Sequence, residues 1–380
     1  MRPRLKDVVW ERVDGNLRIV YDVRDHLLVA DSDGTIEALL ELLREGTRTP
    51  DQVAAEMAGR GHAVSVPDIV AALHQFDAHR LVEDGDRLDR ISAAERERHF
   101  SNLAYFESFA TLDRSREDLR RSLRDCHVLV LGAGGLNSSV IPHLGGLGVG
   151  RLTLLDRDVV EPRNFARQYL YRWADIGRRK ASLAAQWVRD FDPTLEVDAL
   201  DAGVDGPEQL GEILESLRPD VVMSGIDQPD EVDSWVNMAA VTHRVPYVRG
   251  GTLVTQGVVW SVEPGSSACW HCVLNADDAE TMDAELIAER AARRLYEEKV
   301  RVNRGIGPAM GLMGALCAFE VLRYLTRFEE PVFAGRPLSV DFAAGCAMRQ
   351  LTGWTRNPGC SVCGGVFREP AVLVDRAEGR

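Results

Sequence analysis

Four of the seven cysteines form two Cys-x-x-Cys pairs, Cys269 with Cys272 and Cys360 with Cys363. This spacing lets the thiolates of both pairs bind one tetrahedral ion, so the sequence predicts a Zn²⁺ site. Four cysteine ligands leave no coordination position open for water, and the site is therefore expected to support folding rather than catalysis. A thioredoxin-like redox role for either pair is the alternative, but one shared ion explains two such motifs in one domain better.

A glycine turn follows the apolar run Val128–Leu131 and precedes a stretch of helical periodicity. Gly132, Gly134 and Gly135 stand where a tight turn and close approach of the backbone to phosphate are needed. The sixth position of the turn is Asn137 rather than Gly or Ala, which makes NAD a poorer fit. A glycine-rich connection without any ligand is the alternative.

Acidic and cationic residues follow the next apolar run, Leu152–Leu155. Asp156 lies about 20 residues beyond the turn, where a carboxylate can bind the ribose of either NAD or ATP. Arg163, Arg167 and Lys180 come next. A dehydrogenase has no evident use for this cationic cluster, whereas the triphosphate of ATP needs several donors to hold its charge and orient the pyrophosphate. The pattern therefore favours ATP, although any single arginine here could be a surface residue.

These motifs together resemble the ThiF/MoeB adenylyltransferases, the family that includes ubiquitin-activating enzymes. The resemblance rests on the glycine turn, the strand end at Asp156, the run Asn164–Gln168 and Lys180, and it covers about residues 95–365. It implies that ATP activates a carboxylate as its acyl-adenylate. It also implies these roles: Asp156 binds ribose, Asn164, Arg167 and Lys180 contact phosphates, Gln168 supports them, and Asp227 binds Mg²⁺.

Asp227 has a second interpretation, and one family feature is altered. The residue could instead be the N-cap of the helix expected from Val232 to Val241. Members of the family often carry an Arg-x-x-Arg pair whose second arginine reaches the ATP of the neighbouring subunit. Here Arg98 is present but Ser101 takes the second position. We therefore expect the trans-acting cation to be missing from its usual position, with Arg98 as the candidate replacement.

No cysteine lies between Asn275 and Gly305, where thioester-forming relatives often place one. The charged, helical pattern there predicts a mobile crossover segment above the substrate. The resemblance then implies chemistry that stops at the adenylate or passes it directly to a nucleophile. Cys126 and Cys317 are expected to be core residues, and Cys346 has no evident role.

Positioning these residues requires strands that alternate with helices. The runs Val128–Leu131, Leu152–Leu155 and Val221–Ser224 are typical of buried parallel strands, with the polar residues at their carboxyl ends. The predicted fold is therefore α/β, a doubly wound, mostly parallel Rossmann-like sheet. Residues 91–380 are expected to form this adenylation domain, which includes the four-cysteine site.

Residues 1–90 predict a smaller domain, a β-hairpin with a winged-helix-like group of three helices. The hairpin turns at Asp14–Asn16, and the helices are expected at 35–44, 49–57 and 66–76, followed by a charged linker at Asp84–Arg98. The unit resembles the PqqD-like elements that bind a leader peptide as an added strand, although an oligomerisation domain is the alternative. Both domains together resemble the microcin-C-type maturation enzymes, which adenylate a precursor peptide.

The composition restricts the partners. With 380 residues, a net charge of −14 and a pI near 5.2, the chain lacks the basic character typical of nucleic-acid binding. No apolar run approaches the roughly 20 residues of a membrane span, and the basic N-terminus lacks a secretory apolar region, so we expect a cytoplasmic protein. The resemblance implies a homodimer that can work beside other maturation enzymes.

Three functions are compatible with the sequence. The first is adenylation of a carboxylate on a ribosomally made precursor peptide. The second is activation of a ubiquitin-like sulfur carrier that ends in Gly-Gly. The third is a non-catalytic adaptor that delivers a leader peptide to a cyclodehydratase; the presence of Asp156, Arg167, Lys180 and Asp227 counts against it, and Ser101 counts in its favour.

Overall fold

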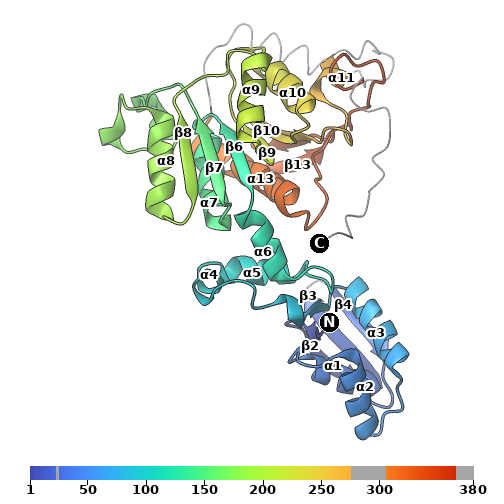
Figure 1. The fold of residues 1–380 in the computed structure, drawn as a ribbon. Coiled ribbons are helices and arrows are strands. Elements are labelled where there is room, and N and C mark those ends of the chain that lie inside the picture. The colour runs from blue at the N-terminus through green and yellow to red at the C-terminus, as the bar shows by residue number, and fades with distance from the viewer. Residues whose placement is uncertain (23–24, 275–304, 365–380) are drawn as a thin grey trace. The chain divides into compact units, whose positions relative to one another are not determined.

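The chain forms two compact units, Met1–Arg124 and Asp125–Arg380. The computed structural model describes residues 1–22, 25–274 and 305–364, and each unit is shown in Figure 1. The predicted boundary between residues 90 and 91 falls within the first unit. The predicted crossover segment lies outside the described residues, apart from Gly305 at its end.

The first unit contains a three-stranded antiparallel sheet and three helices. Asp14 and Gly15 both have positive φ, 51° and 80°, which is the type I′ geometry that suits a two-residue hairpin turn. Capping boxes at Thr49 and Ser65 begin the second and third helices. The predicted hairpin and helices are confirmed. The elements are β2 (Val9–Val13), β3 (Asn16–Asp22), β4 (Asp25–Ala30), α1 (Thr35–Leu43), α2 (Pro50–Gly59) and α3 (Val66–Ala78).

The segment expected to be a linker is instead folded. β5 (Val82–Asp84) pairs with β1 (Pro3–Leu5), and η1 (Gly85–Arg87) and α4 (Ala93–Arg98) follow. Between them, Ile91 is buried, and the Glu117 carboxylate accepts hydrogen bonds from the backbone amides of Arg90 and Ile91. The segment is therefore held in place by a carboxylate from a later part of the chain. The unit ends with α5 (Phe100–Glu107) and α6 (Arg116–Arg124).

The second unit is built on one eight-stranded sheet, in the order β13-β12-β11-β10-β9-β6-β7-β8. The strands from β8 to β10 run parallel, and β11, β12 and β13 continue the sheet in antiparallel pairing. The strands are β6 (His127–Leu131), β7 (Arg151–Leu155), β8 (Glu196–Leu200), β9 (Val221–Ser224), β10 (Tyr247–Leu253), β11 (Gln256–Val262), β12 (Leu338–Asp341) and β13 (Ala347–Gln350).

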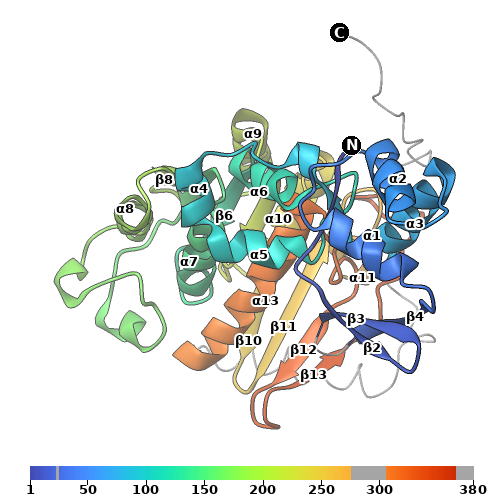
Figure 2. The same cartoon turned by 90° about the horizontal axis from the view of Figure 1, so that it is seen from below.

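Helices cover this sheet in two layers. α7 (Asn137–Leu147) packs against both α8 (Lys180–Phe191) and α13 (Gly307–Thr326), and Figure 2 shows α13 beside α7. α9 (Pro207–Leu217) and α10 (Val232–Thr242) pack together as the other layer. The prediction of a doubly wound, mostly parallel sheet is confirmed.

α13 is the apolar helix at the centre of its layer. Among the described residues it is the one helix long and apolar enough to cross a membrane, but most of it is buried inside the protein. At Gly314, a Cβ would lie 2.6 Å from the Cβ of Ser139 in α7, so glycine is what permits this close approach. The burial of Cys317 in this helix confirms that it is a core residue.

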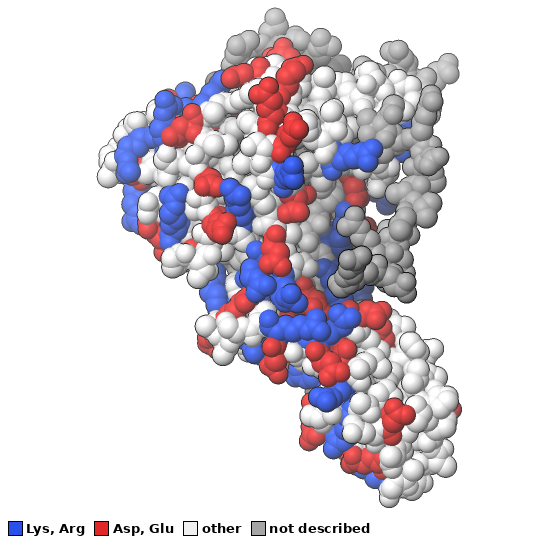
Figure 3. Space-filling model, in the orientation of Figure 1, with Lys and Arg blue, Asp and Glu red and all other residues white. Residues whose placement is uncertain are grey.

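Charged side chains of both signs are interspersed on the face shown in Figure 3. Many pair locally, as Arg151 does with Asp198 at 2.8 Å. Such exposed pairs contribute little to stability, which makes the few buried charged groups of the second unit more informative.

Candidate nucleotide-binding crevice and metal centre

The predicted nucleotide residues gather where the strand order reverses. β6 lies between β7 and β9, and all three strands point the same way. The glycine turn follows β6, Asp156 follows β7, and Asp227 lies three residues after β9. In open α/β sheets, this reversal at the carboxyl edge forms the ligand-binding crevice.

The three glycines of the turn have different surroundings. Gly132 has a φ of +88°, and a Cβ there would lie 2.8 Å from Cγ2 of Ile226. A Cβ on Gly135 would lie 3.0 Å from Cδ of Arg167, so the glycine admits this side chain. At Gly134 the nearest atom would be Nε2 of Gln168, 3.8 Å away, which leaves open space above the backbone. The amides of Gly132 and Ala133 donate within the protein, so it is the later part of the turn, around Gly134, that can offer amides to a ligand on that side.

Asp156 is tied to this turn through its carboxylate. Oδ2 accepts a hydrogen bond from the backbone amide of Ala133 at 2.6 Å, and Oδ1 accepts one from the amide of Asp158 at 2.7 Å. Burial raises the pKa of Asp156, against the opposing effect of these hydrogen bonds and of Lys180. The carboxylate is thus fixed at the end of β7, where a ribose hydroxyl can reach it.

Lys180 is a buried cation with an exposed partner. It is the first residue of α8, and its Nζ donates to Oδ2 of Asp158 at 3.0 Å. The Lys180 side chain is 7% exposed, whereas that of Asp158 is 61% exposed. Because the carboxylate stands at the surface, it can turn away and leave the ammonium to a phosphate.

The segment before α8 contributes the arginine Arg167 and the side-chain amides of Asn164 and Gln168. Asn164 lies in η2 (Pro162–Ala166), where its Oδ1 accepts from the amide of Glu161. Burial lowers the pKa of Arg167, and the carboxylate of Asp227 acts in the opposite direction. Arg163 is different, because its side chain is 81% exposed and pairs with Glu161. The structure thus places Arg167 at the crevice and Arg163 on the surface.

Four buried polar atoms near the turn lack a hydrogen-bond partner in the described part of the chain. They belong to Asn137, Ser138, Gln168 and Ser224: Oδ1, Oγ, Oε1 and Oγ respectively. Leaving such a group unsatisfied costs about 1–3 kcal/mol, so the arrangement fits a polar ligand such as a nucleotide. Sequence reasoning did not assign a role to Ser138 or Ser224. Ser138 directly follows the glycine turn, and Ser224 is the last residue of the predicted strand Val221–Ser224.

Asp227 is exposed and is not a helix cap. The N-cap of α10 is Glu231, which makes no side-chain capping bond. The alternative interpretation of Asp227 is therefore excluded. Its carboxylate is close enough to Arg167 to act on the pKa of that guanidinium. Arg98 and Ser101 lie in the first unit, in α4 and α5, and the role of Arg98 stays a prediction.

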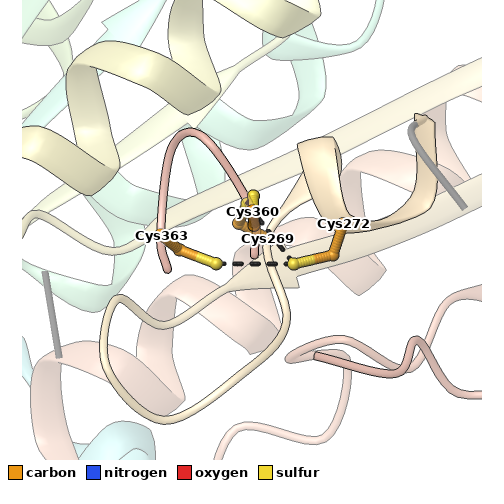
Figure 4. Close-up of side chains that lie close together, drawn as sticks. All are labelled: Cys269, Cys272, Cys360 and Cys363. Atoms are coloured by element: carbon orange, nitrogen blue, oxygen red, sulfur yellow. Dashed lines mark hydrogen bonds between the residues drawn. The ribbon is translucent and has the colours of Figure 1, made fainter. Parts of the chain in front are cut away.

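The four predicted cysteine ligands converge in the second unit (Figure 4). The sulfur atoms of Cys269 and Cys272 are 3.9 Å apart, those of Cys269 and Cys360 3.7 Å, and those of Cys272 and Cys363 3.4 Å. Tetrahedral Zn–S bonds of about 2.3 Å require sulfur separations of about 3.8 Å. The donor set and its spacing therefore fit zinc, and all four residues are buried.

The surroundings of the cluster hold its two halves in place. The backbone amide of Asn357 donates to Sγ of Cys272 at 3.4 Å. In α11 (Trp270–Leu274), Trp270 stacks on Trp260 of β11 with ring centroids 5.2 Å apart, and Trp354 packs against both rings. The cluster is thereby joined to the antiparallel part of the sheet. Outside it, Cys126 is half-buried and Cys346 is exposed.

Comparison with known proteins identifies the family. The model of the ThiF family matches residues 106–362. The molybdopterin-synthase adenylyltransferase of Escherichia coli is 30% identical over 250 residues, 65% of this chain and 90% of that protein. The sulfur carrier protein ThiS adenylyltransferase of E. coli is 30% identical over 260 residues, 68% and 94% of the two chains.

Solved structures agree on the fold over a longer part of the chain. The crystal structure of E. coli MccB with AMPCPP and MccA matches 96% of this chain and 100% of that one, with a TM-score of 0.73 and 19% identity. The structure of PaaA matches 81% and 97%, with a TM-score of 0.62 and 17% identity. The chain therefore belongs to the ThiF family and is an ATP-dependent adenylyltransferase of the ThiF/MoeB type.

Proposed function

We propose that this enzyme adenylates a carboxylate on a ribosomally made precursor peptide during the maturation of a peptide natural product. One observation carries the proposal. The molybdopterin-synthase adenylyltransferase and the ThiS adenylyltransferase of E. coli align in sequence with 65% and 68% of the chain, whereas the structure of MccB, which was solved with MccA, aligns with 96% of it. Most of the first unit lies outside the family match. The additional part of the chain that aligns with MccB therefore includes the first unit, where a leader peptide is expected to bind.

The crevice residues have distinct roles in this reaction. Asp156 binds the ribose of ATP, and the amides of the glycine turn, Asn164, Arg167 and Lys180 hold the phosphates, with Gln168 supporting them. Asp227 would hold Mg²⁺, which would supply positive charge against the triphosphate. The peptide carboxylate attacks the α-phosphorus, the bond to the bridging oxygen breaks, and pyrophosphate leaves. Donors fixed before the reaction stabilise the charge that develops on these oxygens.

In the first unit, residues 1–90 bind the leader segment of the peptide as an added strand. β2 and β4 are the two edges of the β2-β3-β4 sheet. Val9 of β2 is 65% exposed and Leu28 of β4 is 59% exposed, so both edge strands carry apolar side chains at the surface. Backbone hydrogen bonds to such an edge give affinity, and side-chain contacts give selectivity.

The enzyme works in the cytoplasm as a homodimer, beside other maturation enzymes. Zinc binds the four cysteines and stabilises the fold. The donor set of four thiolates supports zinc over magnesium, which prefers oxygen ligands.

Exchange of radioactive pyrophosphate into ATP tests the proposal. The purified full chain is assayed with the short peptides encoded beside its gene, with the same peptides lacking their leader segment, and with Gly-Gly-tailed carrier proteins. Exchange that depends on one peptide, with a raised KM when its leader is removed, is expected. Exchange that depends on a carrier would instead support sulfur-carrier activation, which the two 30% identical relatives favour. No exchange with any candidate, together with tight peptide binding, would support the adaptor.

A further inference from the structure

Arg249 lies on the side of the crevice where no role has been assigned. In β10 it is paired in register with Ser224, the last residue of the neighbouring parallel strand β9. The chain leaves β9 at Ser224 and reaches Asp227 three residues later. Arg249 is therefore at the carboxyl edge of the sheet, like the nucleotide residues, but on the β10 side of Asp227.

The guanidinium of Arg249 is buried and only partly hydrogen-bonded. Its side chain is 10% exposed. Nε donates to Oδ1 of Asp233 at 2.6 Å, and Nη1 donates to the carbonyl oxygen of Gly250. Within the described residues, Nη2 makes no hydrogen bond or ion pair. An arginine has five donor hydrogens in a planar fork, so this group has capacity for one more anionic oxygen.

The other side of the guanidinium is supported by the aromatic cluster. Arg249 is the cross-strand partner of Trp260, and its guanidinium carbon lies 5.7 Å from the centre of the indole ring. Trp260 stacks on Trp270, which stands between Cys269 and Cys272 in sequence. The four-cysteine cluster thus holds the rings against which the arginine rests, and its position is fixed before any ligand arrives.

The charge of Arg249 is retained in spite of its burial. Burial acts to lower its pKa, but the carboxylates of Asp233 and Asp227 outweigh this and raise it. A buried ion pair of this kind is seldom more stable than packed apolar residues of similar size. Stability alone therefore does not explain a buried arginine at the edge of a crevice with a donor that has no partner in the described part of the chain.

Asp227 has an arginine on each side. Arg167 lies against the glycine turn, where phosphate binds, and Arg249 lies farther along the sheet on β10. A carboxylate that attacks the α-phosphorus has to approach from the side opposite the leaving pyrophosphate. We propose that Arg249 binds, through Nη2, the peptide carboxylate that is to be adenylated, and so determines that the substrate ends in a free acid at this point. This inference rests on the proposed function.

Acetate binding tests this inference without any knowledge of the peptide. The full chain is labelled with ¹⁵N at arginine Nε, and acetate is added at constant ionic strength with chloride as the reference. One signal, absent from Arg249→Lys, is expected to shift saturably with acetate and not with chloride. The signal that disappears in Arg163→Gln, a surface arginine, should not shift in this way. No saturable shift, or a shift that persists in Arg249→Lys, would overturn the inference.

Kinetics then connect the site to the reaction. With the peptide that supports exchange, Arg249→Gln should raise the KM for peptide about tenfold to a hundredfold, as expected for losing a hydrogen bond to a charged group. The KM for ATP should be unchanged, and Arg249→Lys should restore part of the loss. An equal rise in both KM values, or no rise at all, would overturn the role. If acetate shifts the Arg249 signal but no candidate supports exchange, the proposed function fails while the carboxylate site stands.

Discussion

The cysteine cluster and the nucleotide crevice lie in the same unit, but their ligand atoms are held in opposite ways. In the cluster, two local knuckles bring four sulfur atoms within 4.8 Å of one another, and all are buried. In the crevice, buried polar atoms of α7, of β9 and of Gln168 lack hydrogen-bond partners among the described residues. A closed set of ligands is suited to an ion that stays, and an open set is suited to reactants that arrive and leave. Damage to the first should therefore appear as lost stability, and damage to the second as lost turnover.

Removing one cysteine ligand should have the largest effect. We expect Cys272→Ser to lose stoichiometric zinc and to lower the thermal midpoint by about 10 °C or more, because metal binding at such sites contributes folding free energy. Metal analysis and calorimetry check this. Cys346→Ser, at an exposed cysteine, is the matched control and should change neither quantity. If Cys272→Ser lost its zinc but kept the same thermal midpoint, the four-cysteine site would not stabilise the fold.

Loss of the buried ammonium should affect the crevice alone. Lys180→Ala is expected to lower pyrophosphate exchange about 10²–10³-fold, the usual result of removing one fixed donor from a developing charge. Circular dichroism and the thermal midpoint should show an intact fold. Arg178→Ala removes a nearby cation whose side chain is 63% exposed, and should leave exchange nearly unchanged. If Lys180→Ala instead unfolds the protein, Lys180 is needed for stability, and the proposed division between a stabilising cluster and a catalytic crevice is wrong.

A methyl group in the glycine turn should give a smaller loss. In Gly135→Ala, the new Cβ would lie 3.0 Å from Cδ of Arg167 and would push that side chain from its place. We expect the KM for ATP to rise about tenfold, as for the loss of one charged contact. Gly146→Ala in α7 is the control, because its Cβ would meet no atom within 4 Å. Equal effects of both substitutions would show that Arg167 does not depend on the turn.

The smallest effect concerns the pH dependence of stability at Asp156. Burial raises the pKa of this carboxyl in the folded protein above its unfolded value. Its contribution to stability is therefore complete at low pH and is lost as the pH rises through the folded pKa. Asp156→Asn should accordingly gain stability relative to the wild type as the pH rises above about 4, the ordinary pKa of an aspartate, while its ATP affinity falls. Calorimetry across this range checks the sign, and an opposite trend would show that the amides of Ala133 and Asp158 dominate over burial.

The sequence predicted those parts of the molecule that depend on local spacing. The Cys-x-x-Cys pairs, the Asp14-Gly15 turn and the run Val128–Leu131 each carry their information within a few residues. The linker prediction failed because the backbone amides of Arg90 and Ile91 donate to the carboxylate of Glu117, which comes later in the chain. Pairings between distant residues leave no local pattern.

The crevice shows the same limit. Lys180 could be predicted from its place after the arginine run, but its partner Asp158 could not. Arg249 and Ser224 escaped notice because each lies in an otherwise apolar strand, and their meaning depends on the register between β9 and β10. Sequence reasoning therefore found the residues that a family pattern marks and missed those that only the folded sheet brings to the edge.

If Lys180 binds a phosphate of ATP as proposed, its pairing with Asp158 makes nucleotide binding an exchange of partners. In the free enzyme the buried ammonium of Lys180 is already paired with the carboxylate of Asp158. An incoming phosphate gains only the difference between its own attraction and that of the carboxylate. Weakly charged competitors, such as AMP or small carboxylic acids, gain less than a triphosphate from this replacement. Under the proposed function, the carboxylate of Asp158 would compete with every incoming ligand for Lys180, and a highly charged ligand would displace it more readily than a weakly charged one.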